Sequence, residues 1–193
     1  VVLAYPRTFP LSVDGELGEP YHDDLTNTAL ARPQDRFMDI VQRLGVCNLL
    51  GGIWRTDVLR QWTVRDTFAS DNLLLPELAL LGHYVQHPEV LFYRRGLRGG
   101  ESSRERVTRA WSDITGKSVA PAWVSAYLLF IRQHWDILFD DRFDLPTHER
   151  YTLAARTAAS LMRRHMLNSW LREDVLPALP APVTRTLRQL WRR

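Results

Sequence analysis

The sequence predicts an α/β fold of the α+β kind, in which a partial mixed sheet with flanking helices is followed by a mostly α-helical region. The chain opens on a β-rich apolar run, residues 1–5. Helical and short strand patterns then follow one another up to about residue 95. After Gly99 and Gly100 the composition changes and the pattern becomes helical. We therefore expect two segments, residues 1–103 and 104–193.

The opening strand and the helix that starts at Pro33 are the clearest predicted elements. Residues 1–5 are typical of a buried strand, which needs neighbours on both sides. Residues 8–32 are rich in Pro, Gly, Asp and Asn, so we expect a long excursion with a turn at Asp14-Gly15. Pro33 then opens an amphipathic helix that Gly45 ends. Its apolar residues recur at helical spacing: Phe37, Ile40, Val41 and Leu44.

Four further elements, two helices and two strands, are expected before the glycine-rich stretch. A short helix covers residues 56–61. A Leu-rich helix capped by Ser70 or Asp71 ends at Gly82, and Pro76 must lie in its first turn or kink it. Two short strands, residues 84–86 and 90–93, flank Pro88.

Charge and composition exclude several classes of protein. The net charge is only +3, and the basic residues, all arginine except Lys117, are spread along the chain, which does not indicate nucleic-acid binding. A single cysteine, Cys47, excludes an internal disulfide. The best apolar run, residues 120–131, is too short to span a bilayer. We expect a cytoplasmic protein, with a peripheral position at the inner face of the membrane left open.

The strongest motif lies in residues 70–95. It reads SDNLLLPEL at 70–78, LG at 81–82 and PEVLFYRR at 88–95. An acidic residue at the start of a Leu-rich helix, a Gly, a short strand and paired arginines resemble the C-terminal signature of family 2 glycosyltransferases. Residues 1–8 look like the strand that follows the Asp-x-Asp metal motif of that family, and residues 47–60 look like its acceptor-side segment. The resemblance covers about residues 1–102.

This resemblance implies a GT-A type fold, of which the chain is the C-terminal, acceptor-side half. It implies inverting transfer of a sugar from a nucleotide-diphosphate sugar to a hydroxyl acceptor, a glycan or a lipid-linked glycan. The nucleotide-binding half and most ligands of a divalent metal ion, Mg or Mn, would lie outside the chain, so the chain alone would be inactive. The family often carries a His shortly after the arginines. Residues 96–102 contain none, so no metal ligand is carried over.

Asp71 occupies the position of the family's catalytic carboxylate, and we expect it to act as general base. A helix N-terminus favours a carboxylate electrostatically. The alternative is that Asp71 only caps the helix, a role worth about 1 kcal/mol. The family often has a second acid directly before this Asp, where this chain has Ser70.

The predicted substrate-binding residues lie in the two flanking segments. Arg94 and Arg95 could bind a diphosphate or an anionic acceptor, with only one of them pointing into the site. Trp54 could stack on a sugar ring beside Arg55, although a core position for the indole is equally expected. The rest of this set belongs to the same acceptor-side segment, where glycines permit close approach of the backbone: Asn48, Gly51 and Gly52.

A second hypothesis is a non-catalytic module in which helical residues 104–193 bind a protein partner or a membrane surface. Residues 185–193 combine arginines with Leu and Trp, as interfacial helices do, but a solvated helix is equally expected there. His134 and His165 each fall on an apolar helical stripe, where packing is the commoner role. We assign them no chemistry.

Overall fold

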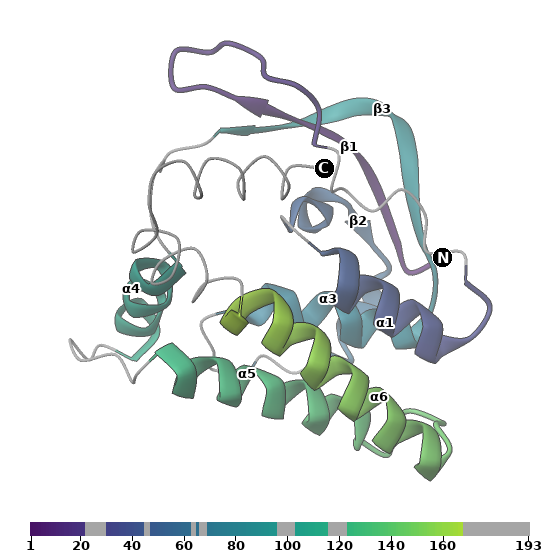
Figure 1. Cartoon of the computed structure of the whole chain (residues 1–193). Coiled ribbons are helices and arrows are strands. Elements are labelled where there is room, and N and C mark those ends of the chain that lie inside the picture. The colour runs from purple at the N-terminus through teal and green to yellow at the C-terminus, as the bar shows by residue number, and fades with distance from the viewer. Residues whose placement is uncertain are drawn as a thin grey trace, which may run out of the picture.

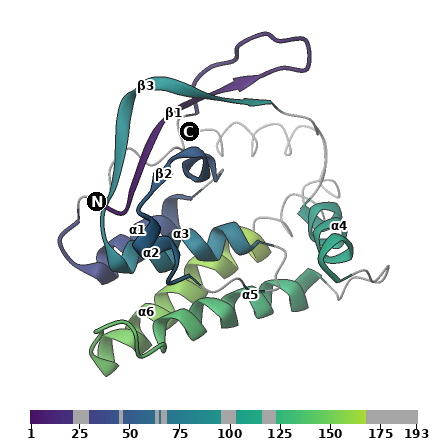
Figure 2. The same cartoon turned by 180° about the vertical axis from the view of Figure 1, so that it is seen from behind.

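A computed structural model describes residues 1–21, 30–44, 47–62, 65, 69–95, 103–115 and 123–167 (Figure 1). The helices and strands in order are β1 (Leu3–Leu11), α1 (Pro33–Arg43), the 3-10 turn η1 (Asn48–Gly51), β2 (Ile53–Trp54), α2 (Thr56–Leu59), α3 (Ser70–Leu81), β3 (Tyr84–Arg95), α4 (Ser103–Thr115), α5 (Trp123–Leu138), α6 (Thr147–Leu161) and the π-helical turn η2 (Met162–Leu167). Figures 1 and 2 show the sheet above α1 and α3, with α5 and α6 on the far side of these two helices.

The sheet is mixed and has the order β2-β1-β3. β1 is central, because it pairs antiparallel with β2 and parallel with β3. Val2, Leu3 and Tyr5 are buried, which confirms the prediction of a buried opening strand. Both of its neighbours come from later in the chain. The predicted α/β class with a mixed sheet and flanking helices is therefore confirmed at this level.

Two predicted strand boundaries are wrong. β1 continues to Leu11, so the excursion begins later than residue 8. It includes a turn in which Gly15 has a φ of +90° and donates to the carbonyl of Ser12, as predicted. Residues 84–95 form one strand instead of two. The register between β1 and β3 shifts on both sides of Arg7, and these shifts accommodate the extra residues around Pro88. β3 lies at the edge of the sheet, where proline is tolerated because the outer side of the strand has no neighbouring strand that needs a backbone N–H donor.

α1 has the predicted buried face. Pro33 is its first residue, and the helix ends at Arg43, with Leu44 in the cap position. Gly45, the predicted end signal, lies outside the described residues. The four residues predicted to form the apolar stripe are all buried: Phe37, Ile40, Val41 and Leu44.

α3 is buried on almost every side, because it lies between the sheet and the helical region. Leu73 and Leu80 pack in a core cluster with α1, α5 and α6. Leu74, Leu75 and Leu78 pack in a second cluster with β1 and η1. The helix ends before Gly82 as predicted. Pro76 is its seventh residue, outside the first turn, so its missing N–H leaves the Asn72 carbonyl without its helical donor.

The helical region contributes α4, α5, α6 and η2. Residues of α5, of α6 and of the loop between them share one core cluster with α1 and α3, whereas Val107 of α4 packs with Ala126 and Tyr127 of α5 in a separate small cluster. Tyr127, Phe130, His134 and Leu138 on α5 are buried, as their spacing predicts. Residues 1–103 and 104–193 thus both supply side chains to the same core. Within the described ranges, no helix combines the length and apolar character needed to cross a bilayer.

Candidate functional site

Asp71 is the second residue of α3 and is half-buried. Its Oδ1 atom accepts hydrogen bonds from the backbone N–H and from Nδ2 of Asn72, each at 3.0 Å. Ala69 occupies the N-cap position, and no side chain caps the helix from there. The prediction that Ser70 or Asp71 is the N-cap residue is therefore wrong by one or two positions. The Asn72 N–H also donates to the carbonyl oxygen of Ala69 at 3.0 Å, so Asp71 is a second acceptor for an N–H that already has a backbone partner.

The thiol of Cys47 lies beside the Asp71 carboxylate. Burial raises the pKa of this thiol, and the charge of Asp71, to which the thiol is hydrogen bonded, raises it further. The positive charges of Arg94 and Arg164 oppose this shift of the Cys47 pKa, so both guanidinium groups are near enough to act on it. The thiol is consequently neutral at physiological pH and available as a hydrogen-bond donor to Asp71.

Arg94 is held by Asn48, a buried residue at the start of η1. The Nη1 group of Arg94 donates to Oδ1 of Asn48 at 2.9 Å. A guanidinium carries five N–H donors, and this bond uses one of them. Arg95, the next residue on β3, is exposed at the end of the strand, opposite Leu11.

Arg164 reaches the same region from η2, at the far end of the helical region. Its guanidinium donates to the carbonyl oxygens of Val41, at 3.4 Å, and Leu44. These carbonyls lie at the C-terminal end of α1, where cationic groups are favoured. We refer to the five side chains that meet here as the Asp71 cluster: Cys47, Asn48, Asp71, Arg94 and Arg164.

The glycines after Asn48 make close contacts within the fold. A Cβ atom on Gly52 would lie 2.5 Å from the carbonyl oxygen of Ala4 and 2.8 Å from Cβ of Tyr5, so any side chain there would collide with β1. A Cβ atom on Gly51 would lie 3.2 Å from the ring of Phe92. The close backbone approach that the two glycines predict is thus an approach to the sheet.

Trp54 and Arg55 follow the glycines on β2 and at the start of α2. Trp54 is half-buried and packs edge-to-face against Tyr84, with the ring centroids 6.1 Å apart. This is the core position that was the alternative to sugar stacking. Arg55 is exposed and forms an ion pair with Asp57. Of the predicted site residues, the structure brings Asn48, Asp71 and Arg94 into one cluster.

Cys47 and Arg164 are the members of the cluster that sequence reasoning missed. Cys47 is the first residue of the predicted acceptor-side segment and the only cysteine of the sequence, which gave a weak signal. Arg164 contacts Leu44 from 120 positions further along the chain. Arg164 reaches Leu44 because of the way η2 packs against α1, and no local sequence pattern indicates this contact.

His134 and His165 are packing residues, as expected. Nδ1 of His134 lies 2.8 Å from the carbonyl oxygen of Phe130, and burial lowers the pKa of the His134 ring to about 4. His165 stacks on Tyr127 with ring centroids 5.1 Å apart, and burial lowers its pKa to about 4 as well. Both rings are neutral at pH 7.

The Asp71 cluster does not fit a divalent cation, since Asp71 is its one carboxylate and such ions prefer several oxygen ligands. Across the described part of the chain, no group of three or more His, Cys, Asp and Glu could hold a metal ion. The expected Mg or Mn ion stays a prediction for residues elsewhere. The glycine-rich residues 96–102 and the C-terminal residues 185–193 lie outside the described ranges.

Comparison of the chain with protein-family models, with curated proteins and with solved structures found no match. The chemistry of the Asp71 cluster is therefore inferred from its own residues.

Proposed function

We propose that this chain is the acceptor-side part of an inverting, family 2-like glycosyltransferase of the GT-A type, with Asp71 as general base. The observation that supports the proposal best is the composition of the Asp71 cluster. One carboxylate at the start of a buried helix lies beside a neutral thiol, and two guanidinium groups, those of Arg94 and Arg164, are near enough to that thiol to act on its pKa. A base for a hydroxyl group and cations for an anionic substrate are the two requirements of sugar transfer from a nucleotide diphosphate.

The proposed reaction is a single in-line displacement. The acceptor hydroxyl oxygen forms a bond to the anomeric carbon while the bond from that carbon to the diphosphate oxygen breaks. The diphosphate leaves with the electron pair, and the hydroxyl proton passes to Asp71. Attack from the face opposite the leaving group inverts the anomeric configuration.

The start of α3 suits Asp71 to this role. The partial positive charge of a helix N-terminus favours an ionised carboxylate, and the bonds from Asn72 orient it. Oδ1 is occupied by the donors of Asn72, whereas a carboxylate offers further lone pairs for an incoming hydroxyl. Because the Cys47 thiol stays protonated, it can steady Asp71 without adding a second negative charge.

The substrates are proposed to be a nucleotide-diphosphate sugar and a hydroxyl acceptor, either a glycan or a lipid-linked glycan. Donor recognition and metal binding would fall to a segment outside this chain. A cytoplasmic location, peripheral at the inner face of a membrane, belongs to the same proposal, because a lipid-linked acceptor would be presented there.

The paired arginines offer a matched test of the substrate-binding half of this proposal. In the protein that carries both halves of the enzyme, Arg94→Ala is expected to raise KM for the anionic substrate by about 10- to 100-fold, since charge-assisted hydrogen bonds contribute about 1.5–3 kcal/mol each. Arg95→Ala, its equally exposed neighbour on the opposite face of β3, is expected to change KM less than about threefold. Initial rates at varied donor and acceptor concentrations measure both values. Equal effects of the two substitutions would contradict the assignment of Arg94.

A further inference from the structure

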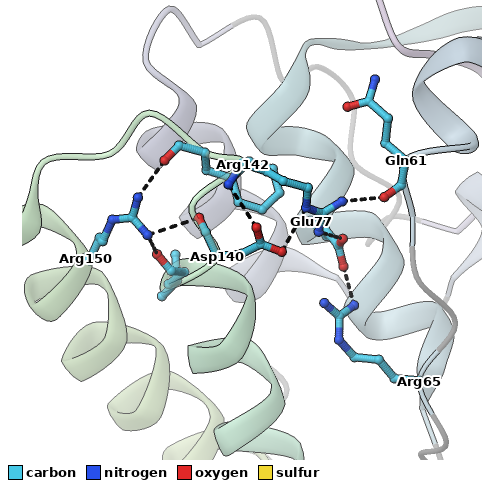
Figure 3. Close-up of polar contacts among 8 residues, drawn as sticks. Gln61, Arg65, Glu77, Asp140, Arg142 and Arg150 are labelled. Carbon is cyan, nitrogen blue, oxygen red and sulfur yellow. Dashed lines mark hydrogen bonds and ion pairs between the residues drawn. The ribbon is translucent and has the colours of Figure 1, made fainter.

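Glu77, in the middle of α3, is a fully buried carboxylate that contacts two arginines. Its Oε1 atom accepts from Nη2 of Arg142 at 2.7 Å, and its Oε2 atom accepts from Nη1 of Arg65 (Figure 3). The Glu77 side chain has 0% exposure, and that of Arg65 has 16%. An unpaired charge at such a depth costs several kcal/mol, so these contacts are a condition for Glu77 to be there at all.

The two arginines come from different parts of the chain. Arg65 lies in the connection between α2 and α3 that leads to Asp71. Arg142 lies in the loop between α5 and α6. Its Nη1 group also donates to the carbonyl oxygen of Gln61, near the start of the same connection (Figure 3). The connection is thus tied at two points, Gln61 and Arg65, through Arg142 and Glu77.

The loop that carries Arg142 is itself held in place. The carboxylate of Asp140 accepts from the backbone N–H of Arg142 at 2.9 Å and from its Nε at 2.8 Å. Arg150, on α6, donates to four carbonyl oxygens of the loop and of the end of α5. Burial opposes the charge of Arg142, but Glu77 and Asp140 outweigh it and raise the pKa of its guanidinium. Arg142 therefore stays charged and fixed.

Asp71 and Glu77 lie on different sides of α3. Six residues at about 100° each place them roughly 120° apart around the helix. The side with Asp71 meets Cys47, and Glu77 turns toward the α5–α6 loop. A helix held from the side of Glu77 cannot rotate or slide without breaking an ion pair, so its other side presents Asp71 in one orientation.

We propose that Arg142 is a positioning residue for Asp71: through Glu77 it fixes α3, and through Gln61 it fixes the residues just after α2, which makes the α5–α6 loop part of the acceptor-site scaffold. This inference rests on the proposed function for its catalytic consequence. Its structural consequence, the fixed position of the α3 N-terminus beside Cys47, can be measured without any activity. The two measurements together separate failure of this inference from failure of the proposed function.

The decisive variant is the double substitution R142M/E77Q in the protein that carries both halves of the enzyme. It removes the Arg142 link without leaving a charged Glu77 buried and unpaired. The matched control is R109M/D113N, which removes the ion pair at 3.4 Å on the surface of α4. A second variant, R142K, keeps the charge but loses the planar fork.

Two readouts are expected to change for R142M/E77Q and to stay constant for the control. The rate at which iodoacetamide labels Cys47, followed on the peptide that carries this residue, should rise at least about tenfold, because the thiol packs beside Asp71. In the enzyme assay, kcat should fall about 10- to 100-fold while KM for the nucleotide-diphosphate sugar changes less than about twofold, as misplacement of a base predicts. For R142K, both the labelling rate of Cys47 and kcat should lie between the values of wild type and of the double variant.

The outcomes are distinct. If R142M/E77Q is folded and both the labelling rate and kcat remain within about twofold of wild type, the positioning role is wrong. If the double variant does not fold, the labelling rate and kcat of R142K are judged by the same criterion, because this variant keeps a positive charge beside Glu77. A faster labelling of Cys47 in a protein whose wild type transfers no sugar would uphold the structural link and reject the proposed function instead.

Discussion

Replacing Asp71 with Asn is expected to lower kcat for sugar transfer by about 10²- to 10⁴-fold, the range that positioned general bases contribute. The amide has the shape of the carboxylate and can still accept from Asn72, but it cannot take up the hydroxyl proton. KM for the nucleotide-diphosphate sugar should stay within about twofold, because this residue faces the acceptor in the proposed reaction. Steady-state kinetics in the protein that carries both halves of the enzyme measure these values.

Asp35→Asn is the matched control, since Asp35 is also a carboxylate in the first turn of a helix and lies outside the Asp71 cluster. It pairs with Arg32 at the surface at 2.8 Å, and its loss should leave kcat unchanged. A folded Asp71→Asn protein with wild-type kcat would contradict the role of base. Loss of turnover together with donor affinity would indicate that Asp71 only supports the helix start.

The largest expected effect on stability comes from Arg36, a buried arginine on α1. Its guanidinium donates to the carbonyl oxygens of Ala79, at 2.7 Å, and Leu80, at 3.1 Å, in the last turn of α3. It also donates to Leu30 and Ala31, which precede α1. Burial lowers the pKa of this guanidinium, which shows that the site opposes its charge. Four hydrogen bonds to carbonyls outweigh that cost and join α1 to α3.

Arg36→Met is expected to lower the free energy of unfolding by about 3–5 kcal/mol, because the apolar side chain leaves the buried carbonyls of Ala79 and Leu80 without the arginine donors. The bonds to the two residues that precede α1 are lost as well. Urea unfolding followed by tryptophan fluorescence measures the change. Arg32→Met, at the N-cap of the same helix, removes an exposed arginine that pairs with the surface carboxylate of Asp35 at 2.8 Å and should cost less than about 1 kcal/mol. A loss below about 1 kcal/mol for Arg36→Met would contradict this account of how α1 and α3 are joined.

Local patterns predicted the elements that bury one regular face. The apolar spacing from Phe37 to Leu44 marked α1, and the leucines between Ser70 and Gly82 marked α3. Pro88 misled the prediction of β3, because a proline is usually a strand end and here a bulge accommodates it at the sheet edge. The start of α3 was misplaced because its N-cap, Ala69, has no side-chain acceptor that could mark it in the sequence.

The candidate site was predictable only in part, because some of its residues are marked by a local pattern and others are brought there by tertiary packing alone. Asp71 and Arg94 stood out through their motif, and Asn48 through its segment. Arg164 and Arg142 act from segments far along the chain, and only tertiary packing brings them to Leu44 and Glu77. One signal was present in the sequence: a lone Glu within a run of leucines has to be paired when it is buried, which pointed to partners without identifying them.

The anomeric configuration of the product tests the central claim most directly. The protein that carries both halves of the enzyme is incubated with a nucleotide-diphosphate sugar and a hydroxyl acceptor, and NMR of the product reports the configuration at the transferred anomeric carbon. The account predicts inversion relative to the donor, and loss of product with Asp71→Asn. Retention of configuration would contradict a single displacement with Asp71 as base, and the absence of transfer from every nucleotide-diphosphate sugar would contradict the proposed function.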